Sequence, residues 1–353
     1  MPDWTRSMQQ SYRFYRVDPV SWLDTDMIGT IKSCSIVRDS ELSTLGSGSF
    51  VLGEKLDEGY IRVYLETVQD GIMEQWPLAT LLMISPRSKF NGQSWSINAD
   101  GYTPLIELKE KLPEIGFTIM EGQNVLDLVT LKTRECARAP LVPIKDATAL
   151  VYEDYSANTD DSMLTFLSDL LNLVKYRFDL DETGHILYAP IQDIESIQPR
   201  ASFDDGNSSI LCKDISEDDD IFGIPNVVEV IYSNNSISLS SKIVNDDPNS
   251  PTSTIRRGRE IQYRETSPNI TGIPTQEQLD EYAEKLLKNL STVQRTISFE
   301  HGYKPIRPGD AVLLNYSRAK IQNVKAVIIR QTIQCDKVCK IQETAVYTAK
   351  LWK

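Results

Sequence analysis

Residues 275–314 read TQEQLDEYAEKLLKNLSTVQRTISFEHGYKPIRPGDAVLL, and this stretch predicts a helix, a strand, a sharp turn and a second strand in that order. Thr275 and Gln278 have the spacing of a helix capping box, so the helix is expected to begin there. The next strand is expected at 293–301. The buried stripe of the helix is predicted to consist of Leu279, Tyr282, Leu286 and Leu287.

The sharp turn is Pro308-Gly309-Asp310, which directly precedes an apolar strand that begins at Ala311. Proline holds its φ at about −65°, and glycine in the next position allows the positive φ that a type II turn requires. The aspartate can then accept hydrogen bonds from nearby backbone amides as the strand begins. Pro308, Gly309 and Asp310 are the site residues that the sequence singles out, and the role predicted for them is structural.

The N-terminal part of the chain is dominated by strand patterns. Residues 27–38 and 59–68 alternate in part between apolar and polar side chains and are rich in Val, Ile, Tyr and Thr. Turn signals such as Asp70-Gly71 separate the segments. We therefore expect half-buried antiparallel strands over roughly 18–100, followed near the C-terminus by a second set of strands.

Helices and a hairpin are expected between the two β regions. Periodic apolar residues predict three helices, which begin near Thr103, Asn124 and either Asp161 or Ser162, and a hairpin over 176–190 follows them. The first helix is expected to bury Leu105, Leu108 and Leu112. The buried face of the second is expected to carry Val125, Leu128, Val129 and Leu131.

These elements predict an α+β chain that is mostly β, with three domains. A first β domain with an N-terminal arm covers 1–120, a helical and small α+β middle domain covers 121–225, and a second β domain with an inserted loop and helix covers 226–353. The polar segments 201–221 and 245–259 are expected to be exposed loops. No residue-level repeat relates the two β regions, although their similar strand content fits a duplication.

The composition is that of a folded and acidic protein. Hydrophobic residues make up 41% and charged residues 25% of the 353 positions. Fifty acidic residues against 37 basic ones leave a net charge of −13, so affinity for nucleic acid through phosphate neutralisation is not expected. A channel that DNA passes without binding suits this charge. No apolar run reaches the roughly 20 residues of a membrane helix, and no N-terminal signal core is seen.

Several motifs suggest chemistry, but each has a simpler explanation. Residues 179–184 follow the first half of a calcium loop, yet the twelfth position is Pro190, which has no carboxylate, so a plain turn is expected. The stretch Gly46-Ser47-Gly48-Ser49 lacks the Lys-Ser/Thr of a phosphate loop and precedes a strand. His301 has no nucleophile motif beside it, and His185 is the other histidine of the chain.

Cysteines and charge clusters give no stronger signal. Cys335 and Cys339 are expected to be reduced thiols at a hairpin tip, with a metal or redox pair as the alternative. The acidic run 217–220 is expected to be solvated, although two carboxylates could meet in space as in a glycosidase. The basic run 256–259 is expected to be a solubilising or partner-binding loop.

No catalytic, cofactor-binding or metal-binding residue is therefore predicted, and the chain is expected not to be an enzyme. The five cysteines are Cys34, Cys136, Cys212, Cys335 and Cys339.

Taken in order, these features resemble the tail hub (baseplate hub) proteins of contractile and related phages and the matching part of type VI secretion spike proteins. The block 275–314 matches their helix, strand, Pro-Gly-Asp turn and apolar strand. The opening stretches 18–22 (DPVSW) and 33–39 (SCSIVRD) are similar to their first strands. The segment 161–190, with a helix, a strand, a turn and a strand that ends in proline, is similar to their small middle domain.

The resemblance implies a structural virion protein with two tube-like antiparallel β-barrel domains in each chain. It implies a homotrimeric ring that joins the six-fold tail tube to a three-fold spike or fibre and lines the channel for DNA ejection. Implied partners are the tail tube or a distal tail protein, the central spike or fibre, and the tape-measure protein. Assembly would take place in the host cytoplasm. The alternatives are a distal tail adaptor ring and a tail-associated peptidoglycan hydrolase or endopeptidase.

Overall fold

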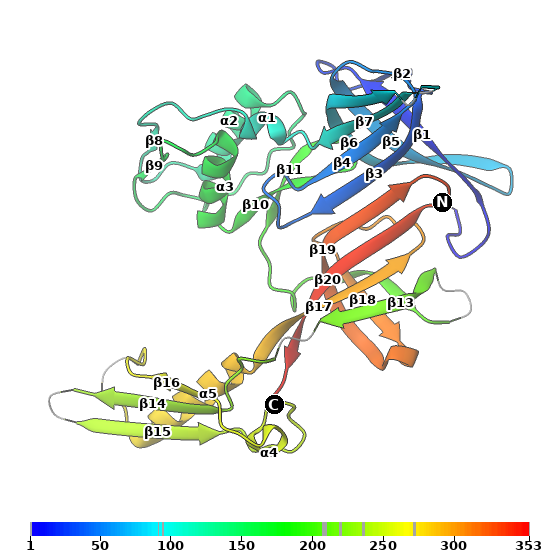
Figure 1. Ribbon diagram of the computed structural model, residues 1–353. Coiled ribbons are helices and arrows are strands. Elements are labelled where there is room, and N and C mark those ends of the chain that lie inside the picture. The colour runs from blue at the N-terminus through cyan, green and yellow to red at the C-terminus, as the bar shows by residue number, and fades with distance from the viewer. Residues whose placement is uncertain are drawn as a thin grey trace. The chain divides into compact units, whose positions relative to one another are not determined.

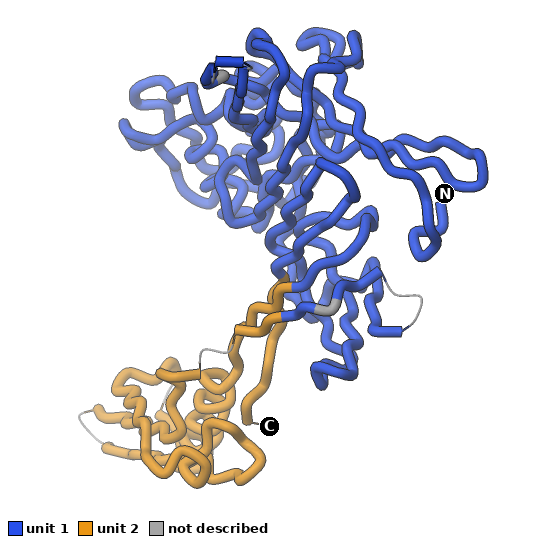
Figure 2. The backbone as a smooth tube through the Cα atoms, turned by 45° about the vertical axis from the view of Figure 1, so that its right-hand side comes forward, with its two compact units in different colours: residues 1–215, 299–344 blue, residues 216–298, 345–353 orange. Residues whose placement is uncertain are grey.

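Two structural units share the chain, and each is made of separate stretches of sequence (Figure 2). The first consists of Met1–Ile215 with Phe299–Thr344, and the second of Ser216–Ser298 with Ala345–Lys353. The division into three domains that the sequence suggests stays a prediction. The computed structural model describes residues 2–90, 92–93, 95–206, 210–218, 221–234, 237–270 and 273–352.

A 13-stranded sheet, most of which belongs to the first unit, runs in the order β13-β17-β20-β19-β3-β4-β7-β6-β5-β1-β2, with β18 beside β19 and β12 beside β18 (Figure 1). Its N-terminal strands are β1 (Gln9–Val17), β2 (Asp24–Met27), β3 (Ile31–Asp39), β4 (Gly46–Leu52), β5 (Gly59–Gln69), β6 (Ile72–Phe90) and β7 (Trp95–Tyr102). Its C-terminal strands are β12 (Pro199–Asp204), β13 (Leu211–Asp218), β17 (Thr292–His301), β18 (Ala311–Tyr316), β19 (Ile321–Cys335) and β20 (Lys340–Lys350), and the 3₁₀ turn η1 (Ser317–Ala319) follows β18.

The predicted N-terminal strands are confirmed. The Asp70-Gly71 signal forms the hairpin between β5 and β6, where Gln69 pairs with Ile72 and both turn residues have positive φ, 51° and 78°. A two-residue turn of this kind matches the twist of its flanking strands. Strands β3 to β7 enclose a core of fully buried side chains that includes Phe50, Leu52, Val63, Leu65 and Leu78.

The two predicted β regions are joined in one sheet by the pairing of β3 with β19. These strands are antiparallel, with Asp39 opposite Arg330 at one end and Cys34 opposite Cys335 at the other. The mostly β prediction is therefore confirmed. The two tube-like barrels that the resemblance implies stay a prediction.

The expectation of a loop over 201–221 is wrong. The segment contributes β12, which pairs in parallel with β18, and β13 at one end of the sheet. Ala201 and Phe203 alternate with exposed residues and are buried, so a short period-two pattern was present but was obscured by the acidic residues around it.

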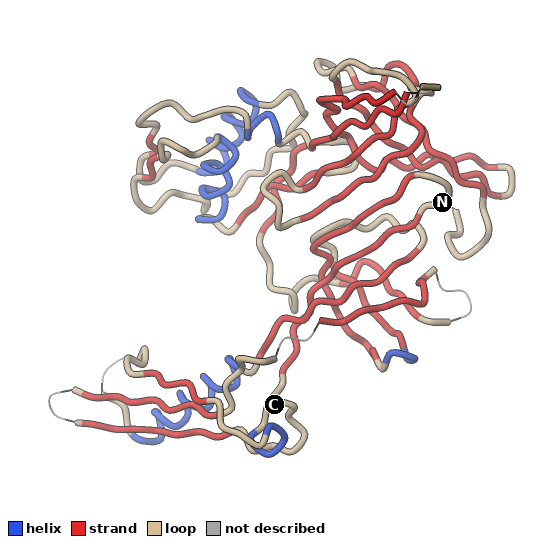
Figure 3. The backbone as a smooth tube through the Cα atoms, in the orientation of Figure 1, coloured by secondary structure: helices blue, strands red, loops and turns tan. Residues whose placement is uncertain are grey.

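Three helices and a hairpin form a lobe beside the N-terminal strands, where the helices of the first unit gather (Figure 3). Its elements are α1 (Ile106–Lys109), β8 (Thr118–Ile119), α2 (Val125–Cys136), β9 (Tyr155–Ser156), α3 (Met163–Leu173), β10 (Tyr176–Leu180) and β11 (Ile186–Pro190). The cap expected at Asn124 is confirmed, because Asn124 accepts a hydrogen bond from the N–H of Asp127. Of the two candidates for the third helix, Ser162 is the cap and accepts a hydrogen bond from Thr165. The first helix begins at Ile106, later than expected, with Leu105 in the cap position.

Two details of the predicted helices are wrong. The first helix ends at Lys109, and Leu112 is 69% exposed, because Pro113 excludes the helical conformation from the residue before it. In α2 the side chain of Leu131 is 53% exposed, whereas Leu126 is buried instead. The periodicity predicted the helix itself correctly. The buried face is rotated from the predicted one, because the elements that pack on the helix select it.

The second unit is a three-stranded sheet, β15-β14-β16, with one long helix packed on it. The predicted capping box of Thr275 and Gln278 is present at the start of the helix, and Leu279 and Leu287 are fully buried. Its elements are β14 (Val227–Ser233), β15 (Ser238–Val244), α4 (Thr254–Arg257), β16 (Gln262–Glu265) and α5 (Gln276–Leu290).

The expectation that 245–259 is an exposed loop is also wrong. Asn245, Thr252 and Ser253 have no exposed surface, and the amide of Asn245 donates to Ser250 Oγ over 2.9 Å. Asn226, equally buried, donates to the carbonyl of Thr252 over 3.0 Å. Polar side chains that satisfy one another and the local backbone can be buried, so polar composition alone did not indicate exposure.

Candidate functional site

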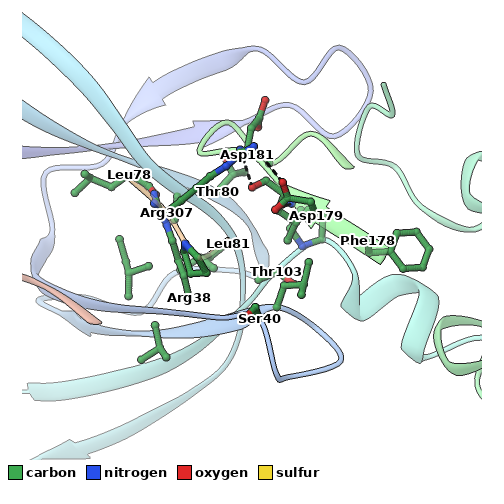
Figure 4. A pocket seen from close by; sticks show the side chains of 18 of the residues that line it. Arg38, Ser40, Leu78, Thr80, Leu81, Thr103, Phe178, Asp179, Asp181 and Arg307 are labelled. Carbon is green, nitrogen blue, oxygen red and sulfur yellow. Dashed lines mark hydrogen bonds and ion pairs between the residues drawn. The ribbon is translucent and has the colours of Figure 1, made fainter. Parts of the chain in front are cut away.

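The hairpin β10–β11 carries the site that best defines how the first unit is held together. Alternation along β10 places Phe178 toward the helices, where its ring lies 5.7 Å from that of Tyr188. Figure 4 shows Phe178 pointing away from the pocket that Asp179 and Arg307 line. One face of this short ribbon therefore packs in the lobe, and the other faces the large sheet.

The tip of the hairpin is the turn 181–184. One carboxylate oxygen of Asp181 accepts hydrogen bonds from the N–H groups of Thr183 and His185, each over 2.9 Å. Gly184 has a φ of 79°. The carboxylate of Asp181 thus serves the turn, as expected for residues 179–184 when they are not a calcium loop.

The large sheet binds this tip through its backbone. The carbonyl of Thr183 accepts hydrogen bonds from the indole N–H of Trp22 over 2.9 Å and from the guanidinium of Arg62 over 3.0 Å. Arg62 is buried and also forms an ion pair with Asp24 at 2.8 Å. A Cβ on Gly184 would lie 2.8 Å from the Cβ of Thr80, so the contact requires glycine.

Arg38 on β3 connects the tip to three strands. Its guanidinium donates to Glu182 Oε1 over 3.3 Å, to Gln331 Oε1 over 3.0 Å and to the carbonyl of Leu78. One side chain thus contacts the hairpin tip, β19 and β6 at the same point. Because an arginine has several N–H donors in a fixed plane, it can hold these elements in one arrangement.

A buried polar pair continues the network into the C-terminal strands. Gln331 donates to Glu343 Oε1 over 2.7 Å, and His301 Nε2 lies 3.1 Å from the same oxygen. The other ring nitrogen of His301 faces the carbonyl of Gly302. Both ring nitrogens of His301 therefore lie beside oxygen atoms of the network. His301 and Glu343 have no exposed surface.

The turn at Pro308-Gly309-Asp310 has the geometry of a type II turn. The N–H of Asp310 donates to the carbonyl of Arg307 over 3.0 Å, and Gly309 has a φ of 96°. The carboxylate of Asp310 accepts a hydrogen bond from the N–H of Arg307, also over 3.0 Å. Two backbone hydrogen bonds with Ile328 attach the turn to β19.

This turn reaches the hairpin through Arg307. Its guanidinium lies 3.1 Å from a carboxylate oxygen of Asp179 and donates to the carbonyl of Leu180 over 3.3 Å. Burial raises the pKa of Asp179, while the charges of Arg307 and Arg177 act in the opposite direction. The space left between hairpin, turn and sheet is only about 60 Å³, so the junction is nearly filled. The structural role predicted for the turn stays a prediction.

The other residues singled out from the sequence lie elsewhere. Cys335 and Cys339 are buried free thiols at the β19–β20 connection, and burial raises the pKa of Cys339 to about 12. Glu217 is exposed, as expected, but it lies on β13 and not in a loop, and it accepts a hydrogen bond from Tyr347. Residues 219–220 of the acidic run lie outside the described residues. In the basic run, Arg257 donates to backbone carbonyls at 221 and 224.

Sequence reasoning missed the residues that build the junction, namely Arg38, Arg62, Gln331 and Glu343. Within the ranges that the structure describes, no group of three or more His, Cys, Asp and Glu side chains is arranged to hold a metal ion. None of the helices in that part of the chain combines the length and apolar character that a membrane span requires.

Comparison with solved structures shows which proteins share this architecture. A tail protein from Neisseria meningitidis superposes with a TM-score of 0.61 at 14% identity, and the match covers 96% of each chain. The chain has the fold of phage tail proteins. A 43 kDa tail protein of the prophage MuSo2 from Shewanella oneidensis also gives a TM-score of 0.61, at 8% identity over 96% of this chain and 98% of that one.

The same fold extends to a secretion system. An Escherichia coli component of the type VI secretion system, described as structurally similar to bacteriophage T4 tail proteins gp27 and gp5, superposes with a TM-score of 0.50 at 11% identity. That match covers 92% of this chain and 75% of the other. The resemblance expected from the sequence is thus confirmed as a likeness of fold. By sequence, the chain matches no protein-family model and no curated protein.

Proposed function

We propose that this chain is a structural hub of a phage or phage-like tail baseplate or tail tip. The observation that carries the proposal is the likeness to a tail protein over 96% of both chains, which includes the helical lobe as well as the two β regions. A partial match of one β region would fit many unrelated proteins. A match over the whole order of elements supports a shared role, and that role is structural in the proposal.

Three copies form a ring in this proposal. Each chain contributes two β regions, one on the β3 side and one on the β19 side of the shared sheet, so three chains present six similar β regions. Such a ring can meet a six-fold tail tube on one side and a three-fold spike or fibre on the other. Closed rotational symmetry of this kind needs repeated surfaces between subunits and no catalysis.

The tube-like barrels of the proposal arise from these same regions. The strand order described above ends at β13 on one side and at β2 on the other. Exposed strand edges are usually covered by further pairing or by other elements. Neighbouring copies in a ring supply such a cover, and the ring then has no free edge.

The charge of the chain supports a channel for DNA. A net charge of −13 gives the lumen of a ring little affinity for phosphate groups, so DNA can pass without being retained. The tape-measure protein would occupy the same lumen before ejection. The tail tube or a distal tail protein, and the central spike or fibre, are the remaining partners in this proposal.

The role is proposed to be non-enzymatic. His301 is enclosed with Glu343 and reaches no surface from which a substrate could approach. Its position is that of a structural residue. A cell-wall overlay assay of the purified chain tests this point: no clearing is expected, whereas clearing by the chain alone, lost on heating, would contradict it.

The mass of the assembled particle tests the hub proposal. Mass photometry at low salt should give a particle of three times the chain mass of 40.0 kDa. A hexamer would favour the distal tail adaptor ring instead, and a monomer at all concentrations and in assembled tails would exclude both.

A further inference from the structure

A second pocket lies beside the junction, where β11 ends. It has a volume of about 270 Å³ and is lined by β10, the loop that follows β11, the turn 307–310 and β19. Ile191 at its rim is 48% exposed, so apolar surface continues out of the pocket. The apolar lining consists of Ala189, Pro190, Ile191, Ile194, Ile197 and Val327.

Arg177 is the charged group of this pocket that has no partner. Alternation along β10 places it on the same side as Asp179, opposite Phe178. Among the described residues its side chain makes no hydrogen bond and no ion pair, although its charge acts on Asp179. A guanidinium that is half-buried without an acceptor is uncommon, because burial of an unpaired charge is costly.

Gly309 leaves room for this guanidinium. A Cβ at position 309 would lie 2.8 Å from Nη2 of Arg177, which is closer than such atoms normally approach. The glycine of the Pro-Gly-Asp turn therefore has a second effect besides its positive φ. It leaves space for the guanidinium of Arg177 beside the turn.

The other charges of the pocket are already paired. Arg307 lies 3.1 Å from Asp179, and Asp310 lies 3.3 Å from the exposed Arg200. Arg200 pairs with Asp310 from outside the pocket lining. Counted with the four charged residues that line the pocket, it leaves a surplus of one positive charge in a chain whose net charge is −13. The site therefore attracts one negative charge, and its apolar walls favour a ligand with an apolar part.

We propose that this pocket binds the side-chain carboxylate of an acidic, apolar peptide segment of a partner protein. The planar fork of Arg177 donates two parallel hydrogen bonds to the carboxylate. Neighbouring apolar side chains of the segment pack on Ile191 and Ile194. A phosphate group is disfavoured, because Arg177 balances only one negative charge and the apolar walls of the pocket solvate a second one poorly. The proposal stands on this pocket and does not depend on the hub assignment.

The test uses two blocked tripeptides, acetyl-Leu-Glu-Leu-amide and its isostere acetyl-Leu-Gln-Leu-amide, with the full chain. Saturation-transfer NMR and calorimetry should show binding of the glutamate peptide and at least about tenfold weaker binding of the glutamine peptide. Arg177→Gln should weaken the binding of the glutamate peptide by a similar factor. Arg177→Lys, which keeps the charge and loses the fork, should give an intermediate loss.

Arg256→Gln is the matched control, because it removes one positive charge from an exposed arginine of the second unit. It should change the affinity by less than about twofold. Equal affinity for the two peptides, an unchanged affinity in Arg177→Gln, or no binding of the glutamate peptide at several millimolar each overturns the proposal. Displacement of the peptide by inorganic phosphate at equal concentration does so too. If Arg177→Gln does not fold, the peptide pair and Arg177→Lys decide the question.

Discussion

Glu343 and His301 are enclosed together: the carboxylate oxygen lies 3.1 Å from Nε2 of the imidazole, and neither side chain has any exposed surface. The same oxygen accepts a hydrogen bond from Gln331, whose own amide oxygen accepts one from Arg38. A chain of polar contacts thus runs from β20 to β3, across the pairing that joins the two β regions.

We predict that Glu343→Gln lowers the free energy of unfolding by about 1–3 kcal/mol, because an amide in place of the carboxylate weakens the buried contacts with Gln331 and His301. Urea unfolding followed by tryptophan fluorescence measures this. Glu300→Gln is the control on the neighbouring strand, since Glu300 pairs with Lys340 at 3.0 Å near the surface and should contribute about 0–1 kcal/mol. Equal effects of the two substitutions would mean that the buried network is not a main source of stability.

Gly309→Val is expected to destabilise the chain by about 1–3 kcal/mol, because a branched residue is strained at a φ of 96°. Gly309→Ala should be milder, although its Cβ still meets the guanidinium of Arg177. Thermal melts measure both variants. Gly29→Val is the matched control, because a Cβ at position 29 meets no atom within 4 Å. An unchanged melting temperature for Gly309→Val would show that the turn is not a constrained element.

We predict that the free energy of unfolding falls in acid as the carboxylate of Glu66 becomes protonated. Hydrogen bonds from Arg13 lower its pKa from 4.5 to about 2, with further contributions from Gln75 and Ser11. A carboxyl whose pKa is lowered by folding stabilises the chain above its unfolded pKa, and this contribution disappears as the pH falls through the folded pKa. The loss should therefore occur between about pH 4.5 and pH 2.

The variant Glu66→Gln isolates this contribution. It should be less stable than the wild-type chain by about 1–3 kcal/mol at pH 7, and the difference should shrink as the pH falls toward 2. Urea unfolding at a series of pH values measures it. A difference that stays constant down to pH 2.5 would show that the ion pair of Glu66 with Arg13 does not stabilise the fold.

Local features of the fold could be predicted from the sequence because they depend on neighbours along the chain. The capping box of α5, the Asp70-Gly71 turn and the positive φ at Gly309 each follow from a few adjacent residues. The exposure of Leu131 did not follow, because the choice of buried face depends on the elements that pack against the helix.

Pairings between distant residues could not be predicted. Cys34 lies opposite Cys335 in the sheet, and nothing in either segment specifies that register. Arg38, Arg62 and Glu343 are ordinary charged residues in strand patterns, and only the fold brings them to the hairpin tip or to His301. The burial of the polar loop at 245–259 was missed for the same reason, because its side chains are buried only through hydrogen bonds that the fold brings together.

The central claim is that three copies form a ring with six β regions, and the rotational symmetry of the purified particle tests it most directly. Two-dimensional class averages from electron cryomicroscopy, taken along the axis, should show a closed ring with three-fold symmetry and six similar lobes around a central channel. A six-fold ring of single chains, or particles without any rotational symmetry, would contradict the account.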